Sequence, residues 1–350
     1  MSDNFTQPVI SADSHVHENR ELWLAKLPPR LREAALAIKG FDIREGSGPI
    51  QRVGEMARDG VSAEVIYTTR GMPMFGLRDV ELQETLFRIY NDWLIEFCQA
   101  APDRLIGIAL ISAYNPLHAV AELRRCREAG LRGAMLWQAP PPELPFYSEH
   151  YSPIWATAQE LRMPISLHIL TGFDGSRELF DKGVTNEVCR ISVNAKLSAA
   201  MQSLFQLLFF GVLDRFPDLK FVLVEQEFGW LPFLLERWDN YYGHNSPAGH
   251  ALSLLPSEYF RRQVYATFFN DSVGCAQLGW WNGAENMMWS SDFPHPNSSW
   301  PNSRQVIARL LGKLPTTLQR KLLCTTVAEL YNLQIPTPLT WREEETTAQA

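Results

Sequence analysis

The feature that most constrains the fold is a regular alternation of two kinds of segment. Short apolar runs rich in β-branched residues alternate with longer stretches in which apolar residues recur at helical spacing. This alternation is typical of βαβ units, in which a helix connects two parallel strands. Eight runs have the length and composition of buried strands: Val9–His17, Ala63–Thr68, Leu105–Ile111, Gly133–Trp137, Pro164–His168, Lys220–Glu225, Gln263–Phe268 and Met287–Ser291.

The segments between these runs predict helices, and eight units together predict a closed (β/α)₈ barrel, an α/β fold. An open doubly wound sheet is the alternative, but no Gly-x-Gly-x-x-Gly turn follows the first strand. We predict one domain over residues 1–333 and a C-terminal arm over residues 334–350. The clearest predicted helices are Glu81–Ala100, Leu117–Ala129, Pro153–Leu161, Val188–Arg215 and Leu231–Tyr242.

Composition excludes several classes of partner. The chain has 39 Asp and Glu residues against 32 Lys and Arg residues, and it has no long basic run, so neither nucleic acid nor an anionic membrane is an expected partner. Its five cysteines are far apart and form no Cys-x-x-Cys pair, which favours reduced thiols and a cytoplasmic location. No signal peptide is visible, and polar residues interrupt the one long apolar stretch, Ile191–Leu213. We expect a small-molecule substrate.

The end of the first predicted strand, Asp13-Ser-His15-Val-His17-Glu18, holds the sharpest chemical signal. Side chains alternate across a strand, so His15 and His17 are expected on the same face. Two neutral imidazoles suit a divalent metal such as zinc, manganese or iron. A pair of surface histidines without a metal is the alternative interpretation.

Two further strands end in candidate ligands. His168 closes the fifth strand and Asp292 follows the eighth. Taken singly, a core histidine and a turn aspartate are the ordinary interpretations. In a barrel, however, the carboxyl ends of the strands share one face, where active sites form. The coincidence of ligand types at the ends of strands one, five and eight therefore predicts a metal site there.

Several motifs resemble the amidohydrolase superfamily, in the branch that contains aminocarboxymuconate semialdehyde decarboxylase and the aromatic-acid decarboxylases. The resemblance extends from about Val9 to Leu333. It implies a (β/α)₈ barrel whose metal is held by His15, His17, His168 and Asp292. Besides these ligands it rests on Gly60-Val-Ser-Ala-Glu-Val, Tyr90-Asn-Asp-Trp, Pro102-Asp-Arg-Leu, Arg215-Phe-Pro-Asp-Leu-Lys, Gly229-Trp-Leu-Pro-Phe and Ser291-Asp-Phe-Pro-His-Pro.

The chain departs from this branch after the sixth strand. Alignment on Gly229-Trp-Leu-Pro places Gln226 where the decarboxylases carry an acid–base histidine. Glutamine cannot accept a proton usefully near neutral pH, so Asp292 and then Glu225 become the candidate catalytic groups, and Gln226 is expected to contact substrate. The alternative for Glu225 is a buried ion pair with an arginine such as Arg237.

Other residues are candidates through their placement in the strand-to-helix loops. Glu18, Glu225 and His295 could hold a second metal or orient the ligands of the first. Trp137 and Phe173 are expected to line an apolar substrate pocket. Three arginines are candidate anchors for a substrate carboxylate: Arg52, Arg70 and Arg177.

We therefore expect a metal-dependent hydrolase or carboxy-lyase (decarboxylase) acting on a small aromatic or unsaturated carboxylic acid derivative. One divalent metal is expected, with zinc first and manganese or iron as alternatives. One rival hypothesis is a dinuclear iron or manganese oxygenase on the same fold. Another is a metal-bearing structural subunit paired with an active paralogue. We expect a homo-oligomer, or a hetero-oligomer with a paralogue under the second rival hypothesis.

Overall fold

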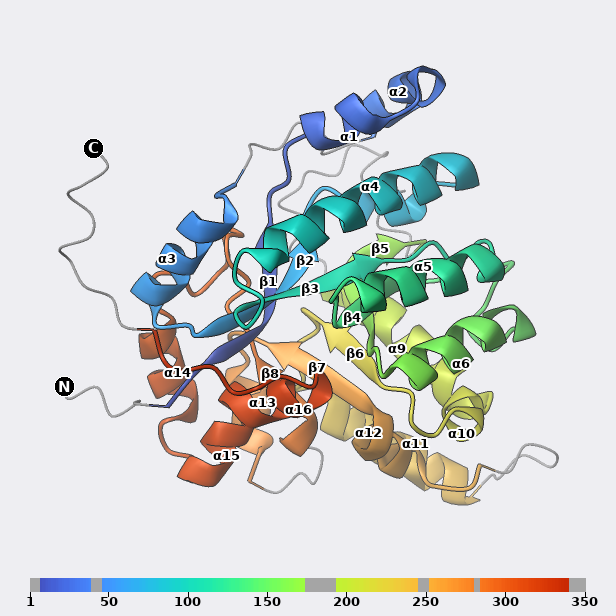
Figure 1. Cartoon of the computed structure of the whole chain (residues 1–350). Helices are drawn as coiled ribbons and strands as arrows, with labels where there is room; N and C mark the ends of the chain where they lie inside the picture. The colour runs from blue at the N-terminus through green and yellow to red at the C-terminus, as the bar shows by residue number, and fades with distance from the viewer. Residues whose placement is uncertain (1–6, 39–45, 174–192, 245–251, 280–283, 340–350) are drawn as a thin grey trace.

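The computed structural model describes residues 7–38, 46–173, 193–244, 252–279 and 284–339 (Figure 1). At its centre lies one eight-stranded parallel sheet whose strands follow each other in sequence order. The predicted (β/α)₈ barrel is confirmed, and each predicted strand coincides with an observed one, with the same ends for Ala63–Thr68 and shifted ends for the others. The strands are β1 (Ile10–Val16), β2 (Ala63–Thr68), β3 (Leu105–Leu110), β4 (Gly133–Ala139), β5 (Ile165–Gly172), β6 (Phe221–Val224), β7 (Val264–Phe268) and β8 (Met287–Trp289).

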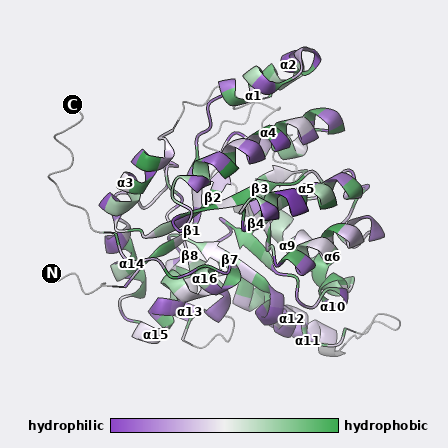
Figure 2. Ribbon diagram, viewed as in Figure 1, coloured by the Kyte–Doolittle hydropathy of each residue, from purple (hydrophilic) through white to green (hydrophobic). Residues whose placement is uncertain are grey.

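Helices surround the strands. Hydrophobic residues gather on the strands and on the helix surfaces that face them, whereas outer helix surfaces are largely hydrophilic (Figure 2). This distribution buries the apolar face of each helix against the barrel. The helices are α1 (Glu21–Lys26), α2 (Pro29–Leu36), α3 (Pro49–Asp59), α4 (Val80–Gln99), α5 (Pro116–Glu128), α6 (Ser152–Leu161), α9 (Val193–Phe209), α10 (Val212–Arg215), α11 (Leu231–His244), α12 (Pro256–Gln263), α13 (Ser272–Gln277), α14 (Ser303–Leu311), α15 (Thr316–Arg320) and α16 (Thr326–Leu330). Short 3₁₀ turns cover Met72–Gly76, Glu149–Tyr151 and Ala284–Asn286, and a π-helical turn covers Lys321–Thr325.

One predicted helix differs from the structure. The stretch predicted as a single helix from Val188 to Arg215 is divided into α9 and α10, and its first five residues lie outside the described part of the chain. Gly211 separates the two helices with a φ of +72°, a left-handed conformation that glycine adopts readily. In the parts of the chain that the structure describes, no helix is both long and apolar enough to cross a membrane.

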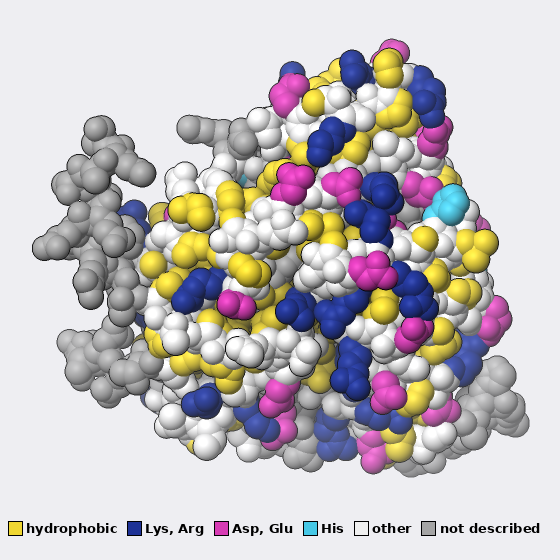
Figure 3. Space-filling view, viewed as in Figure 1, with side chains coloured by type: hydrophobic (Ala, Val, Ile, Leu, Met, Phe, Trp, Pro, Cys, Tyr) yellow, Lys and Arg dark blue, Asp and Glu magenta, His cyan; other side chains and the backbone are white. Residues whose placement is uncertain are grey.

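The surface charges and the C-terminal segment concern two other expectations, the excluded nucleic-acid and membrane partners and the C-terminal arm. On the face shown in Figure 3, basic side chains are interspersed with acidic ones. Arg124 on α5 and Glu160 on α6 form an ion pair at 2.6 Å. Beyond α16, the Thr337 carbonyl accepts a hydrogen bond from Arg104, the residue before β3, at 3.2 Å. The domain boundary at residue 333 stays a prediction.

The first strand contains an irregularity that matters for the site. Ser11 is paired with Glu64 and Ser14 with Ile66, so β1 has one residue more than β2 between these pairs. Such a β-bulge turns the side chains of a strand relative to a regular ladder, and bulges often lie beside active sites. The bulge here covers Ala12 and Asp13, and Asp13 is two residues before His15.

The barrel closes between β1 and β8 through irregular contacts, and we call residues 11–15 and 291–293 the β1–β8 seam. Two backbone hydrogen bonds cross it, from the Asp292 amide to the Asp13 carbonyl at 3.1 Å and from the His15 amide to the Phe293 carbonyl at 2.7 Å. The Ser291 amide donates to the Ser11 hydroxyl at 2.8 Å, and the two hydroxyls lie 3.1 Å apart. Side chains therefore complete a closure that backbone ladders make elsewhere in the barrel.

Candidate metal centre

Strained backbone positions gather at the carboxyl ends of the strands. Four non-glycine residues there have left-handed φ angles: Leu170 at +63°, Glu225 at +59°, Glu227 at +52° and Asp292 at +55°. Each such residue costs about 1–3 kcal/mol unless its surroundings impose the conformation, and strain of this kind concentrates at functional sites. Functional groups are therefore expected at the mouth of the barrel.

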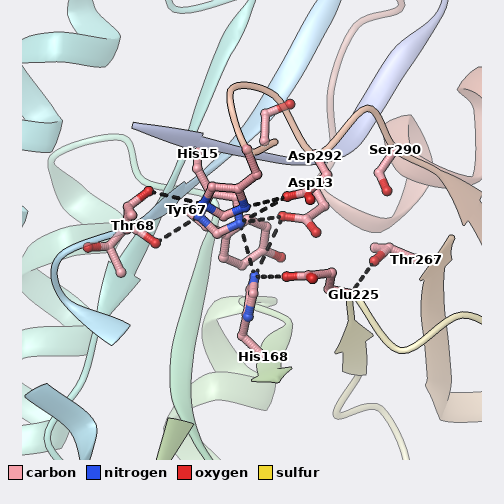
Figure 4. Close-up of polar contacts among 12 residues, drawn as sticks. Asp13, His15, Tyr67, Thr68, His168, Glu225, Thr267, Ser290 and Asp292 are labelled. Atoms are coloured by element: carbon pink, nitrogen blue, oxygen red, sulfur yellow. Dashed lines mark hydrogen bonds and ion pairs between the residues drawn. The ribbon is translucent and has the colours of Figure 1, made fainter. Parts of the chain in front are cut away.

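Two histidines face each other in this mouth (Figure 4). The Nε2 atoms of His15, on β1, and His168, on β5, lie 3.2 Å apart, and both side chains are fully buried. The Nδ1 atom of His15 lies 2.8 Å from the Thr68 carbonyl, and that of His168 lies 3.0 Å from the Ile169 carbonyl. Because a carbonyl oxygen only accepts hydrogen bonds, each Nδ1 atom carries a proton. In a neutral imidazole the Nε2 atom then has a free lone pair.

Two lone pairs at this distance repel each other unless a cation lies with them. A metal ion or a proton can supply that positive charge. A carbonyl bonded to the far nitrogen is also the usual support for a metal-binding imidazole. The two histidines therefore fit a divalent metal on their own geometry.

Carboxylates surround the two imidazoles. In the described part of the chain, neither carboxylate oxygen of the fully buried Asp13 has a hydrogen-bond partner. Its Oδ1 atom lies 3.4 Å from His15 Nε2 and 3.8 Å from His168 Nε2. Asp292 Oδ1 lies 3.6 Å from His15 Nε2, and Glu225 Oε2 lies 3.8 Å from His168 Nε2. A buried carboxylate without a hydrogen bond is costly, and a metal ion would remove that cost.

These donors form two overlapping groups whose ligand atoms lie within 4.8 Å of one another. One group contains Asp13, His15, His168 and Glu225, and the other contains His15, Glu225, Asp292 and His295. Imidazole nitrogens with carboxylate oxygens suit zinc, manganese and iron. The cluster can hold a divalent metal.

The charges of the cluster are strongly coupled. Burial opposes ionisation of Asp13, but the two imidazoles outweigh burial and hold the pKa of Asp13 below its usual range. Burial also opposes a charge on His168, yet contact with Asp13 raises its pKa to about 9. Burial and the neighbouring His295 lower the pKa of His15 to about 4. Contact with Asp13 thus favours a proton on His168 when no metal is bound, and a metal would have to displace that proton.

His17 and Asp13 are placed differently from the sequence expectation. β1 ends at Val16, so the alternation of a strand does not extend to His17. His17 is partly exposed, belongs to neither donor group, and has its ring centre 6.1 Å from that of His295. Asp13, which sequence reasoning passed over, belongs to the first group. The signal for it was present, because Asp13 and His15 are two residues apart on the same strand.

Asp292 and His295 act as a pair. His295 Nδ1 donates a hydrogen bond to Asp292 Oδ1 at 2.8 Å, and the His295 ring lies 4.0 Å from the His15 ring, centre to centre. Burial works against a charge on His295, but the bond to Asp292 and its charge outweigh burial and raise the pKa of His295. This geometry orients the Asp292 carboxylate toward the cluster.

Glu18 is fully buried and is connected to His15 through Thr68. Its carboxylate accepts hydrogen bonds from the Thr68 hydroxyl and, at 3.0 Å, from the Arg70 amide. Burial raises the pKa of Glu18 to about 7. Because the Thr68 carbonyl is the partner of His15 Nδ1, Glu18 supports the segment that orients His15, whereas neither donor group includes it.

Gln226 and Glu225 lie in the strained turn after β6. Gln226 is 2% exposed, and in the described structure its side-chain oxygen and nitrogen have no hydrogen-bond partner. The Thr267 hydroxyl is 2.8 Å from the Glu225 amide and accepts its hydrogen bond. Arg237, named as an example of an arginine that could pair with Glu225, pairs with Glu236 at 2.6 Å instead, and Glu225 Oε2 lies 3.8 Å from His168 Nε2.

The predicted substrate-contacting aromatics pack beside the ends of β4 and β5. The Trp137 ring meets the Phe173 ring edge-on at 6.4 Å, and its Nε1 atom donates to the Tyr151 hydroxyl at 3.0 Å. Trp137 is buried and Phe173 partly buried, so their contact with substrate stays a prediction. Among the candidate anchors, Arg177 lies outside the described residues.

Arg52 is not a substrate anchor. Its side chain is buried and donates to protein groups with all three of its nitrogen atoms. The sequence placed it correctly beside the mouth but could not show where its donors point, because those acceptors are far away in the chain. Arg70 is also buried, and its backbone amide bonds to Glu18.

Comparison with known proteins agrees with this geometry. Residues 12–333 match the amidohydrolase family, so the chain belongs to that family and is one of its enzymes. The γ-resorcylate decarboxylase of Rhizobium sp. (strain MTP-10005) is 25% identical over 255 residues, which cover 66% of this chain and 74% of that protein. The predicted membership in the branch of aromatic-acid decarboxylases is confirmed.

Solved structures agree on the fold. The 5-carboxyvanillate decarboxylase of Sphingomonas paucimobilis has a TM-score of 0.74 and 21% identity, with 94% of this chain and 100% of that chain covered. The dihydroxybenzoic acid decarboxylase of Polaromonas sp. JS666 was solved with manganese and the inhibitor 2-nitroresorcinol. It has a TM-score of 0.71 and 19% identity, and the match covers 93% of this chain and 97% of that chain.

Proposed function

We propose that this enzyme is a metal-dependent carboxy-lyase that removes carbon dioxide from a small aromatic carboxylic acid. The observation that carries the proposal is the pair of facing imidazoles beside the buried Asp13 carboxylate, which has no hydrogen-bond partner in the described structure, at the mouth of a barrel related to decarboxylases. A cluster of this kind binds a divalent cation, and a cation at the mouth can bind an anionic substrate.

We propose His15, His168 and Asp292 as ligands, with Asp13 as the additional ligand that the geometry supports. His17, which the family resemblance implies, is the alternative to Asp13. Zinc is our first expectation for this donor set, and manganese is the alternative that the Polaromonas enzyme suggests. When bound, the ion would supply positive charge that grips the substrate carboxylate and a neighbouring oxygen.

A residue of the protein must then transfer one proton to the substrate. Loss of carbon dioxide breaks the bond between the ring carbon and the carboxyl carbon, and the electron pair left on the ring carbon takes up a proton. Gln226 cannot deliver it, because an amide does not titrate near neutral pH. We assign the transfer to Asp292, which His295 orients through its 2.8 Å hydrogen bond, and we place Glu225 next. General acid catalysis of this kind contributes about 10²–10⁴ in rate.

The enclosing side chains would hold the ring. Trp137 and Phe173 stand on the β4 and β5 side of the cluster and present apolar surface. Gln226 offers a buried donor and a buried acceptor that no described protein group uses, which would suit a ring hydroxyl. A hydroxylated aromatic acid would satisfy both features.

The test is direct. The purified protein is incubated with zinc or manganese and with 2,6-dihydroxybenzoate or 5-carboxyvanillate, and carbon dioxide release is measured alongside the aromatic product. We expect release that depends on the metal and disappears in His168→Ala. Hydrolysis of an ester or lactone substrate without release of carbon dioxide would contradict the proposal and favour the hydrolase.

A dinuclear oxygenase remains a second candidate because the two donor groups share His15 and Glu225. We favour one metal, since His295 Nδ1 already donates to Asp292. Elemental analysis separates the two, with about one metal per chain expected here and two for the oxygenase. We retain a cytoplasmic homo-oligomer as a prediction, and light scattering after size exclusion would show whether it forms or whether a paralogue is needed.

A further inference from the structure

Arg52, on α3, reaches into the β1–β8 seam. The arginine and its partner Glu64, on β2, are each 2% exposed, and Arg52 Nε lies 2.6 Å from Glu64 Oε2. The Nη1 atom donates to the His15 carbonyl at 2.8 Å, and the Nη2 atom donates to the Phe293 carbonyl at 3.3 Å. One guanidinium therefore holds two backbone carbonyls and one carboxylate.

The two carbonyls belong to opposite sides of the seam. His15 supplies an imidazole of the metal centre from β1, and Phe293 directly follows Asp292 in the turn after β8. The guanidinium also lies 4.5 Å from the centre of the Phe293 ring. The Phe293 carbonyl that Arg52 holds is the same one that accepts from the His15 amide at 2.7 Å. Arg52 thus braces the crossing point of the two segments.

We propose that Arg52 is a positioning residue that sets the spacing between the two seam ligands. His15 Nε2 and Asp292 Oδ1 lie 3.6 Å apart, and only irregular contacts join their segments. One guanidinium donates to both carbonyls, and Glu64 accepts from its Nε atom, which holds the guanidinium in place. A lysine has a single nitrogen and cannot reproduce this fork, so the spacing would relax. The inference rests on the proposed metal centre.

A purely stabilising role explains the arrangement less well. Replacing a buried ion pair by apolar groups is often neutral or favourable for stability, so burying Arg52 and Glu64 is weak evidence for stabilisation alone. Groups that orient a ligand typically change metal affinity by about 10- to 100-fold when they are removed. Metal affinity is therefore the quantity that distinguishes positioning from general support.

The first measurement is zinc or manganese affinity, determined by competition with a chromophoric chelator. We expect Arg52→Lys to bind the metal about 10- to 100-fold more weakly than the unaltered protein, with the stoichiometry kept. Arg104→Lys is the matched control. Arg104 also donates to two backbone carbonyls, those of Ser62 at 2.8 Å and Thr337 at 3.2 Å, but neither carbonyl belongs to the β1–β8 seam. We expect its metal affinity to be unchanged.

A second measurement needs no metal. Hydrogen–deuterium exchange of the metal-free protein reports on the His15 and Asp292 amides, whose bonds cross the seam. We expect faster exchange in peptides covering residues 13–16 and 290–294 of Arg52→Lys, with the β3 peptide unchanged. If Arg52→Lys does not fold, Glu64→Gln is measured instead, because it keeps a hydrogen-bond acceptor while removing the charge that fixes Arg52.

The outcomes separate the two proposals. Equal metal affinity and equal exchange in Arg52→Lys would overturn the positioning role and leave the proposed function intact. A protein that binds no metal at all would overturn the proposed function, and unchanged exchange would then remove the role of Arg52 in the seam as well. An equally large loss of metal affinity in Arg104→Lys would show that replacing an arginine outside the seam has the same effect, and would also overturn the proposal.

Discussion

The ladder between β5 and β6 and the seam between β1 and β8 hold the two halves of the candidate site in different ways. On the ladder, His168 is paired with Val224 in an unbroken parallel register, and Glu225 follows directly. At the seam, Asp13, His15 and Asp292 depend on two backbone bonds, on serine hydroxyls and on Arg52.

This difference indicates which side chains can be substituted without displacing the candidate ligands. A regular ladder positions a ligand through repeated backbone bonds, which do not depend on side-chain identity. A seam closed by side chains positions its ligands only while those particular side chains remain. Substitutions in the seam should therefore disturb the metal centre at a distance, and substitutions on the ladder should not.

The largest effect on metal binding should come from removing one imidazole, either His15 at the seam or His168 on the ladder. We expect His15→Ala and His168→Ala each to lose nearly all bound metal while the barrel stays folded, because the ligands lie at strand ends outside the packed layers. Elemental analysis and circular dichroism measure the two quantities. Asp13→Asn and His17→Ala then decide the remaining ligand, and near-stoichiometric metal in either one removes that residue from the ligand set.

The next effect concerns catalysis across the two halves. Asp292→Asn, on the seam, should lower kcat by about 10²–10⁴, the contribution of a general acid. Gln226→Ala, after the ladder strand, should lower it far less and raise KM instead, because Gln226 is expected only to contact substrate. Steady-state kinetics at saturating metal gives both numbers. Equal losses of kcat would contradict this division of roles.

A smaller effect is expected at Glu225. Glu225→Gln should keep the metal-to-protein ratio of the unaltered protein and weaken metal affinity or activity by about 10- to 100-fold, as a group near the ligands does. The ratio is measured at saturating metal. A fall from about two equivalents to one would replace the mononuclear hypothesis with the dinuclear oxygenase.

The smallest effect tests the seam without touching a ligand. Ser11→Ala leaves the buried Ser291 amide without its acceptor, which should lower the free energy of unfolding by about 1–3 kcal/mol. Ser166→Ala, on β5, is the matched substitution on the ladder side. There the Tyr67 hydroxyl loses Ser166 at 2.9 Å but keeps Tyr331 at 3.4 Å, so a smaller loss is expected. Urea unfolding compares them, and a larger loss for Ser166→Ala would reverse the comparison.

Much of the fold could be predicted because its signals are local. A buried parallel strand needs a short run of apolar, β-branched residues, and Ala63–Thr68 was predicted with the observed ends. The undivided helix predicted up to Arg215 failed at Gly211, because helical periodicity does not show a left-handed residue. The candidate ligands His168 and Asp292 could be found for the same local reason, since His168 lies in a recognisable strand and Asp292 follows one.

The sequence by itself determined the barrel, its family and the candidate ligands His15, His168 and Asp292. Only the tertiary structure decided that Asp13 faces His168 while His17 does not, because a bulge and the end of β1 at Val16 break the simple alternation. It also decided the role of Arg52, whose acceptor at Phe293 lies 241 residues away in the chain. Local patterns specify what a segment forms, whereas contacts between distant segments depend on how the barrel closes.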